Sequence, residues 1–164
     1  QRILNINKQR TFICPGNHDI DISKREISKE YINRINEVTI PNNCIITEKV
    51  NLLNNKEDNF SLLIANSCFH NNHKFGEIDL EEFRKKIEMA NMSNKILMLH
   101  HHILPIDRND NSHLSNSYGL IKIFDKFGLN YIIHGHRHSE LKIKINGCKV
   151  IGVGALGGEV EKMA

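Results

Sequence analysis

The sequence predicts an α/β fold in which short buried strands alternate with amphipathic helices. Short apolar runs follow one another along the chain with segments of helical periodicity between them, the order typical of α/β architectures. Three of the apolar runs lead directly into histidine-containing motifs, where an α/β fold places its active-site loops. A chain of 164 residues is long enough for one hydrophobic core but not comfortably for two, and no linker or repeat divides it. We therefore expect a single domain over residues 1–164.

The apolar runs are the candidate strands. They predict strands at residues 11–14, 60–66, 96–99 and 131–133, followed by a hairpin of residues 141–145 and 149–153. The dipeptide Asn146-Gly147 lies between the last two runs, and it is the strongest short-range signal for a hairpin turn.

Three segments have the apolar spacing of helices. Ser23 is a candidate N-cap for the first, Asp79 with Glu82 three residues later for the second, and Gly128 is a natural end for the third. Their apolar faces consist of Ile27, Tyr31, Ile35 and Val38; of Leu80, Phe83 and Ile87; and of Leu120, Phe124 and Phe127. We expect these side chains to form core and to carry no chemistry.

The composition excludes only a few classes of protein. The chain is 40% hydrophobic and 25% charged with a net charge of +3, and its basic residues form no patch, so nucleic acid is expected only as a substrate. No apolar run is long enough to span a membrane. The four cysteines (Cys14, Cys44, Cys68 and Cys148) are scattered without a secretory signal, which predicts reduced thiols and a cytoplasmic protein.

The first motif is Gly16-Asn17-His18-Asp19, directly after the first candidate strand. Gly16 allows a sharp turn, and the amide oxygen of Asn17 suits a divalent cation. His18 is a candidate acid or charge stabiliser, and Asp19 is placed to orient it. An Asx turn with a surface histidine explains these four residues about equally well.

The second motif is the run His100-His101-His102 at the end of the strand predicted over residues 96–99. Because side chains alternate in an extended chain, the three histidines should not all face one metal. We select His100 as the ligand and expect His101 and His102 to be loop residues or to support the ligands. The alternative interpretation is that the three histidines have a purely structural role.

The third motif, His134-Gly135-His136-Arg137-His138, also follows an apolar strand. His136 and His138 are two residues apart, so in an extended segment they point the same way, roughly 6–7 Å apart. That spacing lets each imidazole reach one ion of a metal pair, whose members lie about 3.5–4 Å apart. His134 is expected to pack beside the strand.

The three motifs in this order resemble those of the calcineurin-like metallophosphoesterases, over residues 14 to 154. The resemblance implies that Asn17, His100 and His136 bind one divalent ion and that His138 binds another. It also implies that His18 assists the leaving group. Asp19 is our second candidate catalytic residue, because it is placed to orient His18. The two ions (Mn, Fe or Zn) would activate a bridging hydroxide that attacks a phosphate ester. The fold implied is a four-layer α/β/β/α sandwich.

The sequence departs from the family pattern at its start. The family opens with D-x-H and G-D-x-x-D motifs, and neither occurs before Gly16, where the first fifteen residues contain no Asp. We therefore expect an incomplete domain without the N-terminal strands of the sandwich, and little phosphoesterase activity from this chain alone. Three neutral ligands without a carboxylate hold a divalent cation weakly.

Two other interpretations stay open. The chain could be a catalytically inactive phosphoesterase-like scaffold or remnant that binds at most one metal, although an intact His18 argues against it. Alternatively, His100, His136 and His138 could form a mononuclear zinc site. The polar loop at residues 103–118 is expected to line the active site and to set substrate choice. The sequence does not distinguish a monoesterase from a diesterase, and it predicts no oligomeric state.

Overall fold

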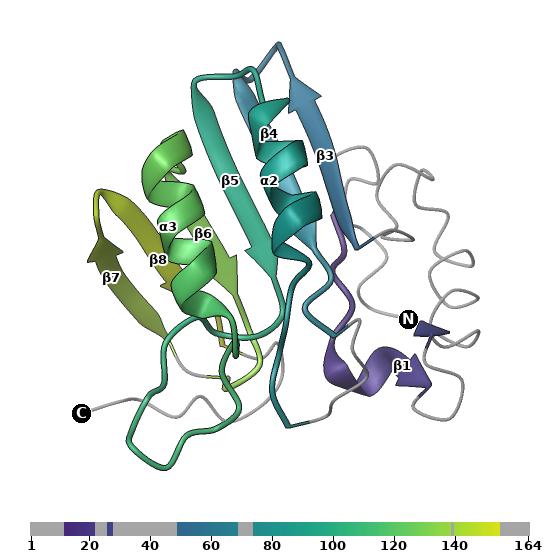
Figure 1. Cartoon of the computed structure of the whole chain (residues 1–164), viewed down its shortest axis with the longest axis vertical. Helices are drawn as coiled ribbons and strands as arrows, with labels where there is room; N and C mark the ends of the chain where they lie inside the picture. Colours follow the sequence, from purple (N-terminus) through teal and green to yellow (C-terminus); the bar gives the residue numbers. More distant parts are fainter. Residues whose placement is uncertain (1–11, 22–25, 28–48, 69–73, 139, 155–164) are drawn as a thin grey trace.

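A six-stranded mixed sheet forms the centre of the protein (Figure 1). The structure, a computed structural model, describes residues 12–21, 26–27, 49–68, 74–138 and 140–154. The strands of the sheet are β3 (Val50–Asn55), β4 (Phe60–Ala65), β5 (Asn94–Leu99), β6 (Tyr131–His134), β7 (Leu141–Ile145) and β8 (Cys148–Gly152). Their order across the sheet is β3-β4-β5-β6-β8-β7. The predicted α/β class is confirmed.

The four inner strands, β4, β5, β6 and β8, run parallel, and each outer strand is antiparallel to its neighbour. The carboxyl ends of β5 and β6 are adjacent, because Leu99 pairs with His134 at the end of the ladder. The sheet therefore brings the segments after these two strands together at one edge. The β7–β8 turn has φ of 47° at Asn146 and 87° at Gly147, the two positive values expected of a tight hairpin turn.

Helices α2 (Leu80–Glu88) and α3 (Ser117–Phe127) cover one face of the sheet (Figure 1). The carboxylate of Asp79 caps α2 by accepting the N–H of Glu82, and Gly128 ends α3 in the left-handed conformation at φ 70°. Phe83 and Phe124 are buried between the helices and the sheet. The second and third predicted helices are therefore confirmed, with their caps.

The opposite face of the sheet carries a smaller apolar cluster. Leu62 and Ile64 of β4 are buried there, and Phe12 and Cys14 pack against them. The strand predicted at residues 11–14 is wrong over its described part, because residues 12–14 form no strand ladder. The side chains of Phe12 and Cys14 lie over the face of β4, and the thiol of Cys14 donates to the carbonyl of Ala65.

Two further sequence predictions differ from the structure. Ile27, placed at the start of the first helix, lies instead in β2 (Glu26–Ile27), which pairs with β1 (Ile20–Asp21). The rest of that predicted helix falls on residues 28–48, outside the described residues. Strand β3 was not predicted, because its sequence alternates poorly and contains three asparagines.

The four-layer sandwich stays a prediction, since one helical layer and one large sheet are what the described residues establish. Cys14, Cys68 and Cys148 are free thiols, as predicted, while Cys44 lies outside the described residues. None of the helices in the described part of the chain has the length and apolar character needed to cross a membrane.

Candidate metal centre

Three segments that are distant in sequence meet at the carboxyl ends of β5 and β6. Asn17 lies in a 3₁₀ turn (Asn17–Asp19), His100 directly follows β5, and His136 lies two residues after β6. Because β5 and β6 are neighbouring parallel strands, their carboxyl ends lie at the same edge of the sheet, and the first residues after them are neighbours. The N–H of Gly135 donates to the carbonyl of His100 at 3.0 Å and ties the two segments together.

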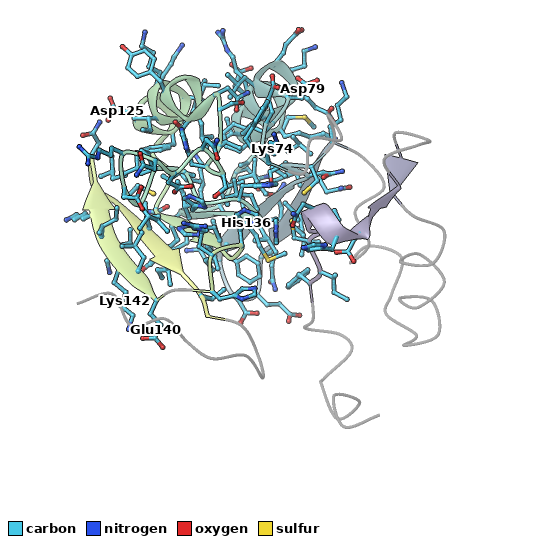
Figure 2. All side chains as sticks on the ribbon, turned by 90° about the horizontal axis from the view of Figure 1, so that it is seen from below. Lys74, Asp79, Asp125, His136, Glu140 and Lys142 are labelled. Carbon is cyan, nitrogen blue, oxygen red and sulfur yellow. The ribbon has the colours of Figure 1, made fainter. Side chains whose placement is uncertain are left out.

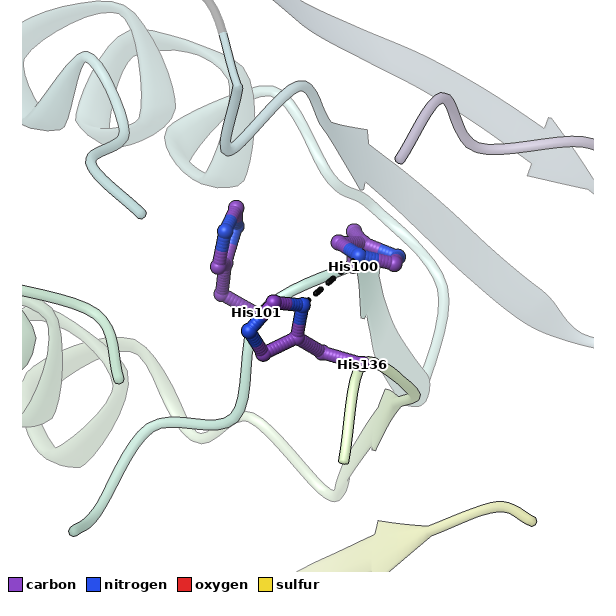
Figure 3. Close-up of side chains that lie close together, drawn as sticks. All are labelled: His100, His101 and His136. Atoms are coloured by element: carbon purple, nitrogen blue, oxygen red, sulfur yellow. Dashed lines mark hydrogen bonds between the residues drawn. The ribbon is translucent and has the colours of Figure 1, made fainter. Parts of the chain in front are cut away.

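The side chains of these segments converge on one point. Nε2 of His100 lies 3.0 Å from Oδ1 of Asn17. It also lies 3.0 Å from Nδ1 of His136, the contact that Figure 3 shows as a dashed line. One ring nitrogen carries either a single hydrogen or a single lone pair, so it cannot make two strong hydrogen bonds here. The structure therefore brings together the three residues that the resemblance assigns to one metal.

His101 joins this cluster, which the sequence argument did not predict. Its ring centroid lies 5.0 Å from that of His100 and 4.6 Å from that of His136. Candidate ligand atoms of the three histidines all lie within 4.8 Å of one another. The three adjacent histidines do not all face this point, since His102 lies outside the group, but His101 joins His100 because β5 ends at Leu99 and the chain bends after it.

Ser67 holds the ring of His101 from the opposite side. Its hydroxyl lies 2.8 Å from Nδ1 of His101 and also accepts the backbone N–H of the same residue. The other ring nitrogen, Nε2, is buried and has no hydrogen-bond partner among the described residues. A buried polar atom without a partner is costly, so this nitrogen is a second observation that fits a metal ion bound by the cluster.

Two glycines allow the rings to lie where they do. A Cβ at Gly16 would come 2.8 Å from Cε1 of His100, and one at Gly76 would overlap Cγ of His101. Any side chain at either position would push the imidazole out of place. The backbone therefore forms a close wall behind each ring.

The imidazoles of the cluster are neutral at physiological pH. Burial, with smaller contributions from the charges of neighbouring histidines, lowers the pKa of His100 to about 4, of His101 to about 2 and of His136 to about 4. Neutral imidazoles keep a lone pair available for a metal.

A buried hydrogen bond supports the cluster from the loop after β5. Nε2 of His102 lies 2.6 Å from Oδ2 of Asp110, and both side chains are almost completely buried. Asp110 also accepts the N–H of Ile106 and both the N–H and the hydroxyl of Ser112. The ring of His102 stacks on that of His136, with centroids 5.7 Å apart.

Burial alone would raise the pKa of the Asp110 carboxyl, but its hydrogen bonds outweigh burial and hold the pKa below the usual range. No sequence signal indicated this pair, since nothing in the spacing of residues 102 and 110 predicts contact.

The segment 135–138 differs from its prediction. His136 and His138 have φ of 73° and 52°, so the chain turns in the left-handed region and is not extended there. His136 is half-buried in the cluster, whereas His138 is exposed and lies outside the group of three histidines. The charge of His138 still lowers the pKa of His100, which places it within electrostatic range of the cluster. His134 is buried at the end of β6, as expected.

The remaining predicted residues lie at the rim. His18 is exposed, and its charge also lowers the pKa of His100. The carboxylate of Asp19 accepts the N–H of Gly16 at 2.8 Å, so it closes the turn that presents Asn17. Thus Asp19 supports the turn that carries the motif.

The cluster suits a divalent transition metal. One amide oxygen and several neutral imidazole nitrogens are ligands that Mn²⁺, Fe²⁺ and Zn²⁺ accept. The short approach of Asn17, His100 and His136 and the unpartnered Nε2 of His101 both fit such an ion.

The fold and the cluster define an α/β protein with a histidine-rich centre at the carboxyl ends of its parallel strands. Comparison with known families identifies which class this is: the sequence model of the calcineurin-like phosphoesterases matches residues 2–140. The chain belongs to the calcineurin-like phosphoesterase family. This match confirms the predicted family.

Two solved structures resemble the chain in fold. A putative 5'-nucleotidase from Staphylococcus aureus, in complex with alpha-ketoglutarate, is 12% identical with a TM-score of 0.50, covering 85% of this chain and 31% of its own. GAP50, the anchor in the inner membrane complex of Plasmodium, is 11% identical with a TM-score of 0.45, covering 68% and 39%. The chain thus spans well under half the length of either. No curated protein matches it.

Proposed function

We propose that this chain supplies one metal subsite of a two-metal phosphoesterase, with Asn17, His100 and His136 as its ligands. The proposal is supported by the convergence of donor atoms from three separate segments: Oδ1 of Asn17 and Nδ1 of His136 each lie 3.0 Å from Nε2 of His100. When bound, a divalent metal pair lowers the pKa of water and neutralises phosphoryl oxygens. The proposed substrates are phosphate esters, and the proposal includes both monoesters and diesters.

The other residues of the motifs act around this subsite. His138, exposed beside the cluster, is proposed as the ligand that this chain gives to the second ion. His18 is exposed at the rim, where an imidazole can donate a proton to the leaving oxygen of a bound ester. Asp19 fixes the turn that holds both Asn17 and His18. The cytoplasmic location is part of the same proposal.

His136→Ala tests the ligand assignment. Because His136 provides one of three converging donors, its loss should weaken Mn²⁺ binding by more than roughly 100-fold, beyond the effect of residues that only support ligands. Binding is measured by calorimetric titration of the complete gene product, and metal-dependent phosphate release from p-nitrophenyl phosphate and its diester is followed in parallel.

The matched control is His113→Ala, a half-buried histidine that contacts His102 and not the cluster. It should change Mn²⁺ affinity little. Equal loss in both variants would contradict the assignment, because it would show that metal binding follows general stability. Tight metal binding without hydrolysis of either ester would favour the inactive scaffold instead.

A further inference from the structure

A small polar pocket lies beside the metal centre. Its volume is about 170 Å³, and its lining is Asp107, Asn109, Asp110, Asn111, Ser112 and Arg137. Five of these residues belong to the loop after β5, and the sixth lies between His136 and His138. The pocket therefore opens between the loop predicted to set substrate choice and the segment that carries the candidate ligands.

The pocket is directly connected to the cluster. Asp110 forms part of its wall and also pairs with His102, whose ring stacks on His136. Arg137 follows His136 in the chain, and its charge lowers the pKa of both His102 and His136. A group bound in the pocket would thus lie next to a phosphate held at the cluster.

Hydrogen bonds within the loop hold the wall of the pocket in shape. Four bonds to the buried carboxylate of Asp110 fix the loop from Ile106 to Ser112. Oδ1 of Asp107 accepts the N–H of Asn109 at 2.7 Å and closes a local turn. A pocket formed in advance loses little entropy when a ligand enters.

The side chains that line the pocket retain hydrogen-bonding capacity. Within the described residues, no hydrogen bond is recorded for Oδ2 of Asp107 or for the guanidinium of Arg137. Asn109 and Asn111 are exposed and add amide donors and acceptors. A carboxylate, a guanidinium and amides together suit a group that both donates and accepts hydrogen bonds at several positions, as hydroxyl groups do.

The lining also argues against other ligands. It contains no aromatic or aliphatic residue, so a nucleobase or another flat apolar ring would find no surface to stack on. The carboxylate of Asp107 disfavours a purely anionic group. At about 170 Å³ the pocket is smaller than a site for a whole drug-sized ligand, which suits one moiety of a larger substrate.

We propose that this pocket binds the hydroxyl-rich part of the substrate, such as a sugar ring, that carries the phosphate to be cleaved. The proposal rests on the proposed function and names its substrate class: a phosphorylated sugar or polyol. Asp107 and Asn109 are the specificity-determining residues, through hydrogen bonds to substrate hydroxyl groups.

Asp107→Asn tests the proposal with little risk to the fold, because the amide oxygen can still accept the N–H of Asn109. With the Mn²⁺-loaded complete gene product, KM for ribose 5-phosphate and glucose 6-phosphate should rise about tenfold, the loss of one hydrogen bond to a charged group. Hydrolysis of p-nitrophenyl phosphate, which has no hydroxyl groups for the pocket, should stay within about twofold of the unsubstituted protein.

Asp125→Asn is the matched control. Asp125 is an exposed carboxylate on α3, well away from His136 (Figure 2), and its substitution should leave all three KM values unchanged. An equal loss on the sugar phosphates and on p-nitrophenyl phosphate after Asp107→Asn would overturn the proposal.

A second measurement needs no hydrolysis. Free ribose or glucose, added with inorganic phosphate, should shift the side-chain amide resonances of Asn109 and Asn111 saturably, and Asp107→Asn should weaken this binding. If these shifts occur but no ester is hydrolysed, the pocket assignment holds and the proposed function fails. If p-nitrophenyl phosphate is hydrolysed but the sugars cause no shifts, the pocket assignment is wrong and the function stands.

Discussion

The helical face of the sheet and the histidine edge of the same sheet differ in the kind of side chain that they bury. On the helical face, Phe83 and Phe124 are buried among apolar side chains, and the helix ends are capped. At the edge, polar side chains are buried, His101 leaves a ring nitrogen without a partner, and His136 has positive φ. Local preferences agree with the fold in the first region and are overridden in the second, and such violations concentrate at functional sites.

The largest expected difference between the two regions is their contribution to the pH dependence of the free energy of unfolding. In the folded, metal-free protein, burial keeps His100 and His136 neutral down to about pH 4, whereas unfolded histidine protonates near its ordinary pKa of 6.5. The unfolded state therefore binds more protons between these values, so the free energy of unfolding should fall as pH decreases from 6.5 to 4. Each such histidine contributes up to about 1.4 kcal/mol per pH unit.

The measurement is urea unfolding with a chelator present at several pH values. Among the described residues, the core on the helical face contains no histidine. His136→Ala should therefore make the pH dependence shallower, while Phe124→Ala should leave it unchanged. An unfolding free energy that is flat from pH 6.5 to 4 would show that the buried imidazoles are already protonated or readily hydrated.

Phe124→Ala should have the next largest effect, and it acts on the helical face. Phe124 is 1% exposed and central to the core, so its truncation should lower the free energy of unfolding by about 3–5 kcal/mol. Tyr118→Ala on the same helix is the control, since Tyr118 is 71% exposed and its loss should cost within about 0.5 kcal/mol. Chemical denaturation at neutral pH measures both. Similar values for the two variants would mean that α3 is not packed as described.

Gly16→Ala should have the smallest effect of the three, and it is confined to the edge. A methyl group there would lie 2.8 Å from Cε1 of His100 and would turn the ring away from Asn17 and His136. Mn²⁺ affinity should fall about 10–100-fold, as when a residue that orients a ligand is lost.

Gly135→Ala is the matched control, because nothing lies within 4 Å of a Cβ at that position. Calorimetric titration compares the two variants. If both bind Mn²⁺ like the unsubstituted protein, His100 can shift without loss and is not held as closely as its contacts indicate.

The same contrast explains what the sequence could predict. Helices α2 and α3 were predictable because their signals are local. Each helix has its own apolar spacing, Asp79 caps the helix that follows it directly, and Gly128 ends the helix that precedes it. The hairpin turn at Asn146 followed from local chemistry in the same way. Strand β3 was missed, because its place in the sheet comes from pairing with β4 and not from its own composition.

The candidate site was predictable in its members but not in its geometry. Motif order identified Asn17, His100 and His136, and the structure brings them together. The orientation of His101 depends on where β5 ends, and the turn at His138 depends on positive φ angles. The spacing of apolar residues predicts neither of these features. The His102–Asp110 pair lies between loop residues and left no pattern in the sequence.

The spacing of the three donors along the chain has a consequence for folding. Asn17 and His100 are 83 positions apart, and His100 and His136 are 36 apart. Contacts between such distant segments form only after long loops have closed. An ion that joins all three donors would act as a reversible cross-link between the beginning, middle and end of the described chain. Since it binds the folded state alone, the thermal midpoint of unfolding should rise with the concentration of free metal, and the metal would serve as a reporter of whether the whole chain has folded.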